Sequence, residues 1–329
     1  MNAIAETLSG PQFVDCANLG GPRFLITVDT EEEFDWNAPF SRDAHGTRHI
    51  GAIGRFQEMC DFHGSKPAYL VDYPVANDGK AVDLLGSFAH DGRADIGVQL
   101  HPWVNPPFDE ALNLSNSYAC NLNPELEREK LLILHQAIRN NFKLNPDIYR
   151  AGRYGAGNAT AGILQELGIK IDTSVRAHFD YSAQGGPDYF DSPLAPYWLR
   201  TGRVLELPIT TVFRGIFRKK GVTVFRDMLS SGTSRSIMAR TGLLERIALT
   251  PEGIPLAKAI EGIDCALEEG VPILNFSFHS PSLEAGHTNY VRNAEDLENF
   301  YNWWHVIFEY LEKKGVKPIS AREVKAAFF

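Results

Sequence analysis

The sequence of 329 residues predicts an α/β fold, in which a parallel sheet covered by helices forms an irregular, closed or nearly closed (β/α) barrel of seven or eight strands. Short apolar runs typical of buried strands alternate along the chain with stretches of helical spacing. No GxGxxG or Walker sequence follows a predicted strand, which argues against a doubly wound nucleotide-binding sheet. No linker rich in Pro, Gly or Ser divides the chain, so we expect a single domain.

Seven runs rich in β-branched and aromatic residues are predicted to be buried strands. In chain order they are residues 24–29 (FLITVD), 67–73 (PAYLVDY), 96–100 (IGVQL), 148–150 (IYR), 169–175 (IKIDTSV), 204–209 (VLELPI) and 273–278 (ILNFSF). The stretches between them include four with the spacing of amphipathic helices. These are residues 125–142, 159–167, 255–270 and 294–315.

Composition excludes several classes of function. The 32 Lys and Arg against 41 Asp and Glu give a net charge of −9, which disfavours nonspecific binding to nucleic acid or to an anionic membrane. No run approaches the roughly 18 consecutive apolar residues of a membrane span. The four cysteines are far apart and form no CxxC pair, so we expect neither a disulfide framework nor a cysteine zinc site. They are Cys16, Cys60, Cys120 and Cys265.

The domain prediction has three parts. Residues 1–20 are an N-terminal extension that lacks the basic and apolar regions of a secretory signal, so we expect a cytoplasmic protein. Residues 21–329 form one barrel. A segment around residues 213–253 interrupts the α/β rhythm, and its first 34 residues carry eight Lys or Arg against two acids. This basic insertion is either a solvated surface or a surface that attracts an acidic or phosphorylated substrate.

Ionisable residues gather at the predicted strand ends, where the carboxyl termini of parallel strands share one rim. Asp29 and Glu31 are two positions apart and are therefore expected on the same face. Five further ionisable residues end or follow other strands: His101, Arg150, Asp172, Glu206 and His279. Each alone has a structural explanation, such as a helix cap, an Arg150–Glu206 ion pair or a hydrogen-bonded core histidine. Together they indicate a functional site, because buried charge is costly unless it is paired or used.

Five ordered segments resemble the motifs of the polysaccharide deacetylase family, carbohydrate esterase family 4, which contains the NodB homology domain. They are TVDTEEE (residues 27–33), IGVQLHPWVN (96–105), YRAGRYGAGN (149–158), IDTSV (171–175) and FSFHSPS (276–282). The resemblance covers roughly residues 24–320. The wording of these motifs, with HTNYV after the last, most resembles the WalW-like deacetylases of lipopolysaccharide biosynthesis.

The resemblance implies a role for each matching position. Asp29 would be the catalytic base and Arg150 the residue that positions it. Asp172 would orient His279, the general acid. The metal ligands, for a divalent ion that we expect to be Zn²⁺, would be Glu31, His101 and Asn105.

Aromatic and polar residues beside these motifs are the predicted substrate contacts. An aromatic ring can stack on the apolar face of a sugar, although a core role is equally open for each of these rings. The predicted substrate-binding residues are Trp36, Trp103, Tyr154, Glu206 and His287. The expected substrate is an N-acetylated saccharide or a nucleotide- or lipid-linked sugar, and the sequence does not set the oligomeric state.

The sequence departs from the family pattern at two metal positions. Asn105 replaces the second histidine and Glu31 replaces an aspartate, so metal binding should be weaker unless Glu33, Asp35 or His287 substitutes. Two other functions therefore remain open. One is a barrel that binds a glycan or nucleotide-sugar without turnover, and the other is a metal-independent amidohydrolase acting on a cyclic amide.

Overall fold

The structure, a computed structural model, describes residues 11–35, 38–200, 202–227 and 232–329. Its main element is one ten-stranded sheet that includes all seven predicted strands. The strand order is β1 (Gln12–Phe13), β7 (Tyr197–Arg200), β8 (Val204–Glu206), β6 (Ile171–Asp172), β5 (Ile148–Ala151), β4 (Asp95–Leu100), β3 (Ala68–Val71), β2 (Arg23–Thr30) and β11 (Ile273–His279), with β12 (Lys317–Pro318) also paired to β2. Neighbours from β8 to β11 are parallel, whereas β7 and β1 form an antiparallel edge.

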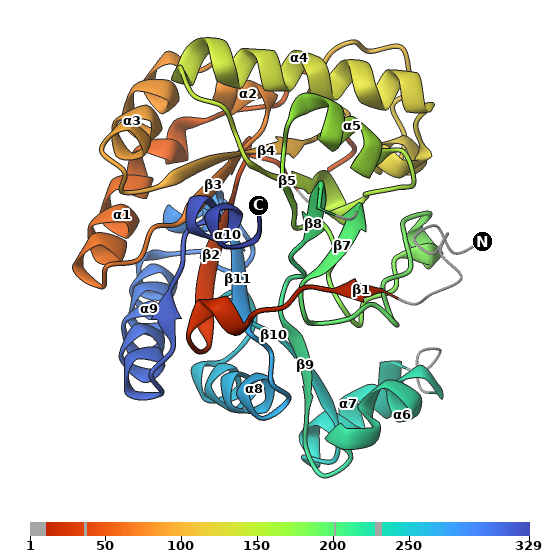
Figure 1. The fold of residues 1–329 in the computed structure, drawn as a ribbon, viewed down its shortest axis with the longest axis vertical. Helices are drawn as coiled ribbons and strands as arrows, with labels where there is room; N and C mark the ends of the chain where they lie inside the picture. The colour runs from red at the N-terminus through yellow and green to blue at the C-terminus, as the bar shows by residue number, and fades with distance from the viewer. Residues whose placement is uncertain (1–10, 36–37, 201, 228–231) are drawn as a thin grey trace.

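The sheet curls but does not close into the barrel expected from the sequence. Between β11 and β8 lies a two-stranded hairpin of β9 (Thr211–Arg214) and β10 (Glu245–Ala248). Only the base of this hairpin reaches β11, where the Thr210 amide donates to the Asn275 carbonyl at 3.2 Å and the Ser277 amide to the Leu249 carbonyl at 3.2 Å. The hairpin then leaves the sheet, as Figure 1 shows, and the ladder is not continued.

Ten helices are present in the described residues, including the four predicted from spacing. They are α1 (Ile53–Phe62), α2 (Tyr73–Ala76), α3 (Gly79–His90), α4 (Pro124–Phe142), α5 (Thr160–Leu167), α6 (Gly221–Asp227), α7 (Gly232–Arg240), α8 (Leu256–Glu268), α9 (Ala294–Lys313) and α10 (Ala321–Phe328). Local signals set their starts. Asn123 caps α4 ahead of a proline at the first helical position, and Ser320 and Glu323 form a capping box on α10. None of the helices described is long and apolar enough to cross a bilayer.

Eight short 3₁₀ turns connect these elements within the described residues. They are η1 (Ala17–Leu19), η2 (Arg48–Ala52), η3 (Ser115–Ser117), η4 (Ala119–Asn121), η5 (Gly152–Tyr154), η6 (Ser182–Gln184), η7 (Arg218–Lys220) and η8 (Ser280–Leu283). Two of them, η5 and η8, directly follow the strands β5 and β11. They therefore shape the carboxyl rim of the sheet.

Successive side chains of β2 alternate between the face of the sheet that packs against the helices and the inner face of the curled sheet. Phe24, Ile26 and Val28 belong to the large core cluster shared with the helices. Leu25 belongs to a smaller cluster, formed by inward residues of neighbouring strands and by α10. Because successive side chains point to opposite faces, Asp29 shares the inner face with Leu25. The inner face thus changes from apolar at the amino end to charged at the carboxyl end, where a barrel-like sheet places its chemistry.

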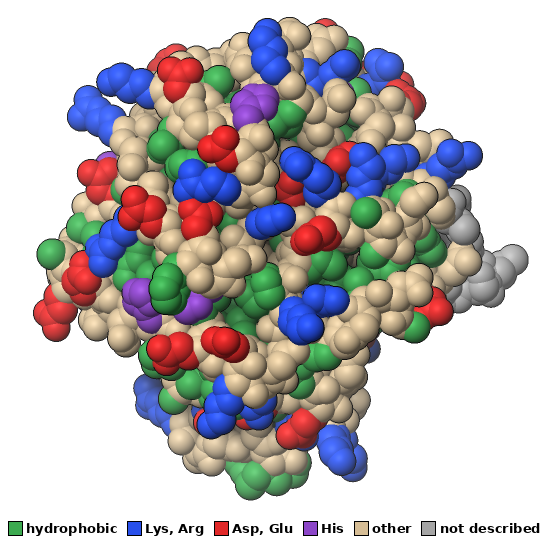
Figure 2. Space-filling view, turned by 60° about the vertical axis from the view of Figure 1, so that its left-hand side comes forward, with side chains coloured by type: hydrophobic (Ala, Val, Ile, Leu, Met, Phe, Trp, Pro, Cys, Tyr) green, Lys and Arg blue, Asp and Glu red, His purple; other side chains and the backbone are tan. Residues whose placement is uncertain are grey.

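The surface bears no single dominant charge on the face drawn in Figure 2. Acidic and basic side chains are interspersed there, with histidines among hydrophobic and acidic neighbours. The excess of acids in the sequence is therefore not offset by a broad basic patch on this face.

Candidate active site

Asp29 and Arg150 meet at the carboxyl rim of the sheet. Asp29 lies near the end of β2 and Arg150 in β5, both on the inner face. The Arg150 guanidinium is fully buried, forms an ion pair with Asp29, and donates to Thr27 Oγ1 at 2.6 Å and Ser277 Oγ at 2.9 Å. It also donates to the Thr173 carbonyl at 3.0 Å. These contacts fix the Asp29 carboxylate in place and compensate the buried charge of the arginine.

His279, the last residue of β11, faces Asp29. Its Nε2 lies 3.7 Å from Asp29 Oδ2, and its side chain keeps 21% exposure whereas Asp29 keeps 3%. Asp29, Glu31 and His279 offer ligand atoms that all lie within 4.8 Å of one another. Three of the predicted site residues therefore form one cluster, in which the imidazole is the most accessible to solvent.

The carboxylate that holds His279 is Glu252, not the predicted Asp172. Glu252 Oε2 lies 2.7 Å from His279 Nδ1, and Oε1 accepts hydrogen bonds from the His279 amide at 3.1 Å and Ser282 Oγ at 2.6 Å. Burial lowers the pKa of His279, but the surrounding carboxylates, Glu252 first and then Glu31 and Asp29, raise it to about 10. The imidazole is therefore protonated at neutral pH.

Asp172 is directed away from this cluster by strand alternation. Its neighbour Ile171 belongs to the inner apolar cluster, so Asp172 points to the opposite face of β6. There its Oδ1 accepts hydrogen bonds from the amide and hydroxyl of Ser174. The Ser174 hydroxyl in turn accepts the Ala151 amide at 2.8 Å, and burial raises the pKa of Asp172 to about 6. Asp172 thus helps to join β6 to β5.

The same alternation removes Glu206 from the predicted substrate contacts. Leu205 and Leu207 are inner residues, so Glu206 points to the outer face of β8. It is fully buried, and its Oε1 accepts the Val175 amide at 3.0 Å. Burial, followed by the charge of Asp172, raises its pKa well above the usual range. A sugar has no access to this carboxyl group. The alternative explanation by an Arg150–Glu206 ion pair does not apply, because Arg150 pairs with Asp29.

Glu31 and His101 are brought together as predicted. His101 Nε2 lies 3.4 Å from Glu31 Oε2, and burial raises the pKa of Glu31 to about 8. The other ring nitrogen, Nδ1, lies 2.7 Å from Glu32 Oε2. If Nδ1–H donates to Glu32, the lone pair of Nε2 faces Glu31, which is the usual arrangement of a metal-binding histidine with a supporting carboxylate.

Glu32, which the sequence prediction did not include, is fixed by Asp72 and Trp103. Its backbone amide donates to Asp72 Oδ2 at 2.8 Å, and its Oε1 accepts Trp103 Nε1 at 2.7 Å. Burial raises the pKa of both Glu32 and Asp72. Trp103 is 1% exposed, and its ring stacks on His101 with centroids 4.3 Å apart. Trp103 was predicted to contact substrate, but this ring is occupied in holding Glu32 and His101.

Three predicted substrate contacts remain: Trp36, Tyr154 and His287. Trp36 lies outside the described residues. Tyr154 is partly exposed and stacks on Tyr181 with centroids 5.6 Å apart, so it stays a predicted sugar contact. His287 keeps 26% side-chain exposure and lies 3.8 Å from Glu33, and its role also stays a prediction.

Asn105 is held mainly through its amide nitrogen. Nδ2 donates to the Pro106 carbonyl at 2.7 Å and to the Lys130 carbonyl at 3.0 Å. Its Oδ1 is buried and has no hydrogen-bond partner in the described part of the chain. A buried oxygen without a partner is costly, and a metal ion is one group that would satisfy it.

The donor set fits a divalent metal ion. Tetrahedral ligands at zinc distances lie about 3.4 Å from one another, and the Glu31–His101 pair has this spacing. The acidic and histidine groups of the rim are thus able to bind a metal. Two clusters of described residues have ligand atoms within 4.8 Å of one another: Asp29 with Glu31 and His279, and Glu32 with Asp72 and His101. The identity of the ion rests on the resemblance alone.

We expect Glu32→Gln to weaken metal binding by about 10- to 100-fold, because supporting carboxylates orient the histidine ligand and raise its basicity. Titration of Zn²⁺ against a chromophoric chelator measures this affinity without any substrate. Glu58→Gln, an exposed position on α1, is the matched control. Equal Zn²⁺ affinity of the Glu32 variant and the wild type would show that the Glu32 carboxylate does not support metal binding by His101.

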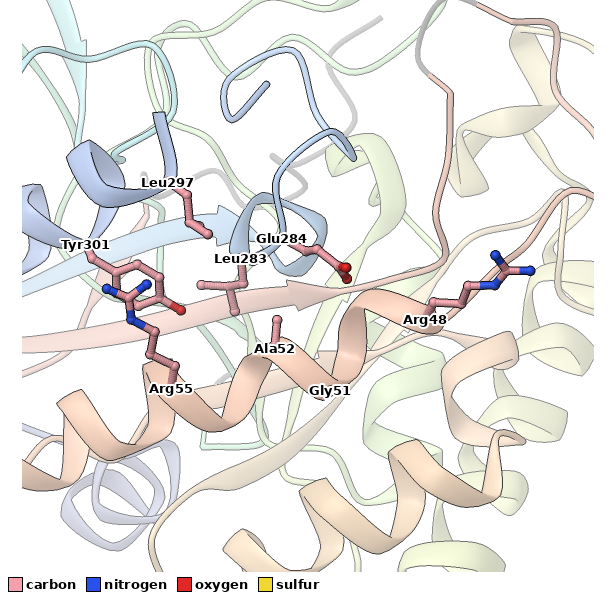
Figure 3. A pocket seen from close by; sticks show the side chains of 8 residues that line it. All are labelled: Arg48, Gly51, Ala52, Arg55, Leu283, Glu284, Leu297 and Tyr301. Atoms are coloured by element: carbon pink, nitrogen blue, oxygen red, sulfur yellow. The ribbon is translucent and has the colours of Figure 1, made fainter. Parts of the chain in front are cut away.

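Two surface hollows flank the catalytic cluster. One, of about 420 Å³, is lined by residues of η2, α1, α9 and the end of η8, and Figure 3 shows Glu284 and Leu283 on its wall. The other, of about 430 Å³, includes Gly253 and Tyr290 beside the Glu252 loop. Neither of these two hollows is lined by Asp29, Glu31 or His279, and of the Asp29–His279 pair the His279 side chain is the more exposed.

The comparisons with known proteins address the fold. No family model and no curated protein matches the chain. The chain is similar to a solved structure of a candidate glycoside hydrolase/deacetylase from Parabacteroides distasonis, with 12% identity over 93% of this chain and 71% of that chain and a TM-score of 0.61. A candidate polysaccharide deacetylase from Mycobacterium smegmatis is matched at 18% identity over 97% and 96% of the two chains, with a TM-score of 0.49.

A family 4 acetyl xylan esterase from Clostridium thermocellum in complex with cobalt is matched over 48% of this chain and 60% of that chain, at 13% identity and a TM-score of 0.31. The similarity to the last two structures is too low to support a shared fold. The chain therefore has the fold of the glycoside hydrolase/deacetylase structure, with its ionisable residues at the carboxyl rim of the sheet.

Proposed function

We propose that this protein is a hydrolase that removes N-acetyl groups from a saccharide. The observation that carries this proposal is the facing pair of Asp29 and His279, 3.7 Å apart, in which each side chain has its own buried partner. Arg150 forms an ion pair with Asp29, and Glu252 raises the pKa of His279. A base and an acid on opposite sides of one small space are what amide hydrolysis requires.

In the proposed reaction a water molecule attacks the acetyl carbonyl carbon while Asp29 takes the water proton. The carbon–nitrogen bond then breaks, and the His279 proton passes to the departing nitrogen, giving acetate and a free amine. Each of these general acid and base steps contributes typically 10²- to 10⁴-fold to the rate. Arg150 holds Asp29 in a fixed position, and Glu252 positions His279 and raises its pKa.

A divalent metal, which we propose to be Zn²⁺, would be held by Glu31 and His101, with Asn105 as a third ligand. When bound, such an ion polarises a carbonyl and lowers the pKa of a coordinated water. Glu32, Asp72 and Trp103 support His101 from behind.

The substrate is proposed from the motif wording and the basic insertion. Both favour an intermediate of lipopolysaccharide or another surface polysaccharide, presented as a nucleotide- or lipid-linked sugar in the cytoplasm. The free thiols of all four cysteines are compatible with a reducing compartment.

Acetate release from a panel of N-acetylated nucleotide-sugars and lipopolysaccharide intermediates tests this function. We expect release from at least one member, loss of release in chelator, and recovery when Zn²⁺ is added back. Failure to release acetate from every member, while one of them binds in calorimetry, would instead identify a non-catalytic binding barrel. Full activity in chelator would favour a metal-independent amidohydrolase.

A further inference from the structure

Two arginines beside the candidate site are not neutralised by carboxylates. Arg176 follows β6 and forms a parallel bridge with Ile209, so it lies at the same carboxyl rim as the catalytic residues. Arg246 lies in β10, a few residues before Glu252. Among the described residues, no carboxylate lies within ion-pair distance of either guanidinium. Both are only partly exposed.

The two guanidiniums share one aromatic neighbour. The centroid of the Phe179 ring lies 3.9 Å from Arg176 Cζ and 3.5 Å from Arg246 Cζ. Arg176 also donates to the Tyr181 hydroxyl at 3.4 Å, and Arg246 donates to the His178 carbonyl. Neutral partners of this kind fix the arginines but leave both charges uncompensated.

Three other arginines of the basic insertion differ in this respect. Arg214 pairs with Glu245 and Glu261, Arg218 with Glu268, and Arg226 with Asp191. These positive charges are already neutralised, so they contribute little attraction for an anion. The sequence alone pointed to the whole insertion. In the structure, Arg246 is distinguished by packing on the same Phe179 ring as Arg176, which lies outside the insertion.

Two tyrosines connect these arginines to the catalytic cluster. Arg176 Cζ lies 5.3 Å from the centroid of Tyr154, which follows Arg150 by four residues. Burial raises the pKa of both Tyr154 and Tyr290. The charge of Arg176 opposes both rises, whereas Asp29 adds to the rise at Tyr154 and Glu252 to the rise at Tyr290. Burial, followed by the charge of Arg176, lowers the pKa of Arg246 to about 10. The two positive charges therefore repel each other, and a bound anion would reduce this repulsion.

We infer that Arg176 and Arg246 form an anion-binding subsite that takes a phosphate group carried by the acetylated sugar. This inference rests on the proposed function for its sugar component. The phosphate would bind the two guanidiniums, with the acetylated ring against Tyr154 and the acetamide directed to Asp29 and His279. Guanidinium groups suit this role because their planar donors match phosphate oxygens.

Calorimetry with N-acetylglucosamine 1-phosphate and with N-acetylglucosamine measures the contribution of the phosphate without any turnover. We expect the wild type to bind the phosphorylated sugar at least about tenfold more tightly, as one or two charge-assisted hydrogen bonds would give. Arg176→Gln and Arg246→Gln should each remove most of that preference. Arg246→Lys, which retains the charge, should keep part of it.

Arg218→Gln is the matched control, since it removes one positive charge from the same insertion at a residue already paired with Glu268. It should leave the preference intact, and thermal unfolding of each variant reports whether the fold is kept. Equal binding of the two sugars by the wild type, no binding of the phosphorylated sugar, or an equal loss in the control would overturn the inference. UDP-N-acetylglucosamine and polyprenyl-phosphate-linked N-acetylglucosamine then distinguish the two carriers of the phosphate.

The two proposals fail in different ways. A phosphate preference without acetate release would contradict the deacetylase function and leave the subsite standing. Acetate release from neutral and phosphorylated sugars with equal affinity would contradict the subsite alone.

Discussion

Asp29→Asn should lower acetate release by about 10²- to 10⁴-fold, because the amide cannot accept the proton of the attacking water. The asparagine oxygen still accepts a hydrogen bond from Arg150, which also retains Thr27, Ser277 and the Thr173 carbonyl as partners. The fold should therefore persist, with some loss of stability, since the buried guanidinium loses its counter-charge. Initial rates at saturating substrate, together with thermal unfolding, measure the two effects separately.

Ser277→Ala is the matched control for Asp29→Asn. It removes another partner of the Arg150 guanidinium but keeps the carboxylate, so we expect it to cost about 1 kcal/mol of stability and only a small part of the rate. A rate for Asp29→Asn close to that of the wild type, in a protein that unfolds normally, would mean that another group is the base.

Glu252→Gln should lower the rate strongly while Asp172→Asn leaves it nearly unchanged. We expect about a 10²-fold or greater loss for the Glu252 variant, since an uncharged partner no longer stabilises protonated His279 or fixes its ring. Asn at position 172 still accepts from Ser174, so this change mainly affects the contact between β6 and β5. The sequence-based assignment predicts the opposite ranking of the two variants, and the pair therefore decides between them.

The pH profile of Glu252→Gln separates a positioning role from a merely structural one. The carboxylate of Glu252 helps to raise the pKa of His279, so its removal lowers that pKa. Activity that needs protonated His279 falls as the pH rises through this pKa, and the alkaline limb should therefore move to lower pH in the variant. An unshifted alkaline limb, with only a uniformly reduced rate, would assign Glu252 to structure alone.

The basic character of residues 213–253 shows why a charge count is a poor guide to a binding surface. The structure pairs Arg214, Arg218 and Arg226 with acids that are remote in sequence. Pairing of this kind depends on which side chains the fold brings within about 4 Å of each other. No count along the chain contains that information.

Local patterns in the sequence determined the strands, the four amphipathic helices and the rim on which the chemistry lies. Apolar runs and helical spacing depend on near neighbours in the chain, and the alternation rule correctly placed Asp29 and Glu31 together. The same rule applied to Ile171–Asp172 and Leu205–Glu206 would have turned both acids outward, since the apolar member of each pair faces inward. The alternation of apolar and acidic residues was visible in the sequence, but using it required knowing which face of each strand is the inner one.

Only the tertiary structure decided the partners across the site. Glu252 follows β10 in the turn TPEG, which has the composition of an ordinary loop, and it meets His279 because the hairpin base bonds to β11. Asp72 and Glu32 likewise come together from different strands behind His101. Periodicity fixes which way a side chain points along its own strand, whereas contacts between distant segments depend on the curl and the incomplete closure of the whole sheet.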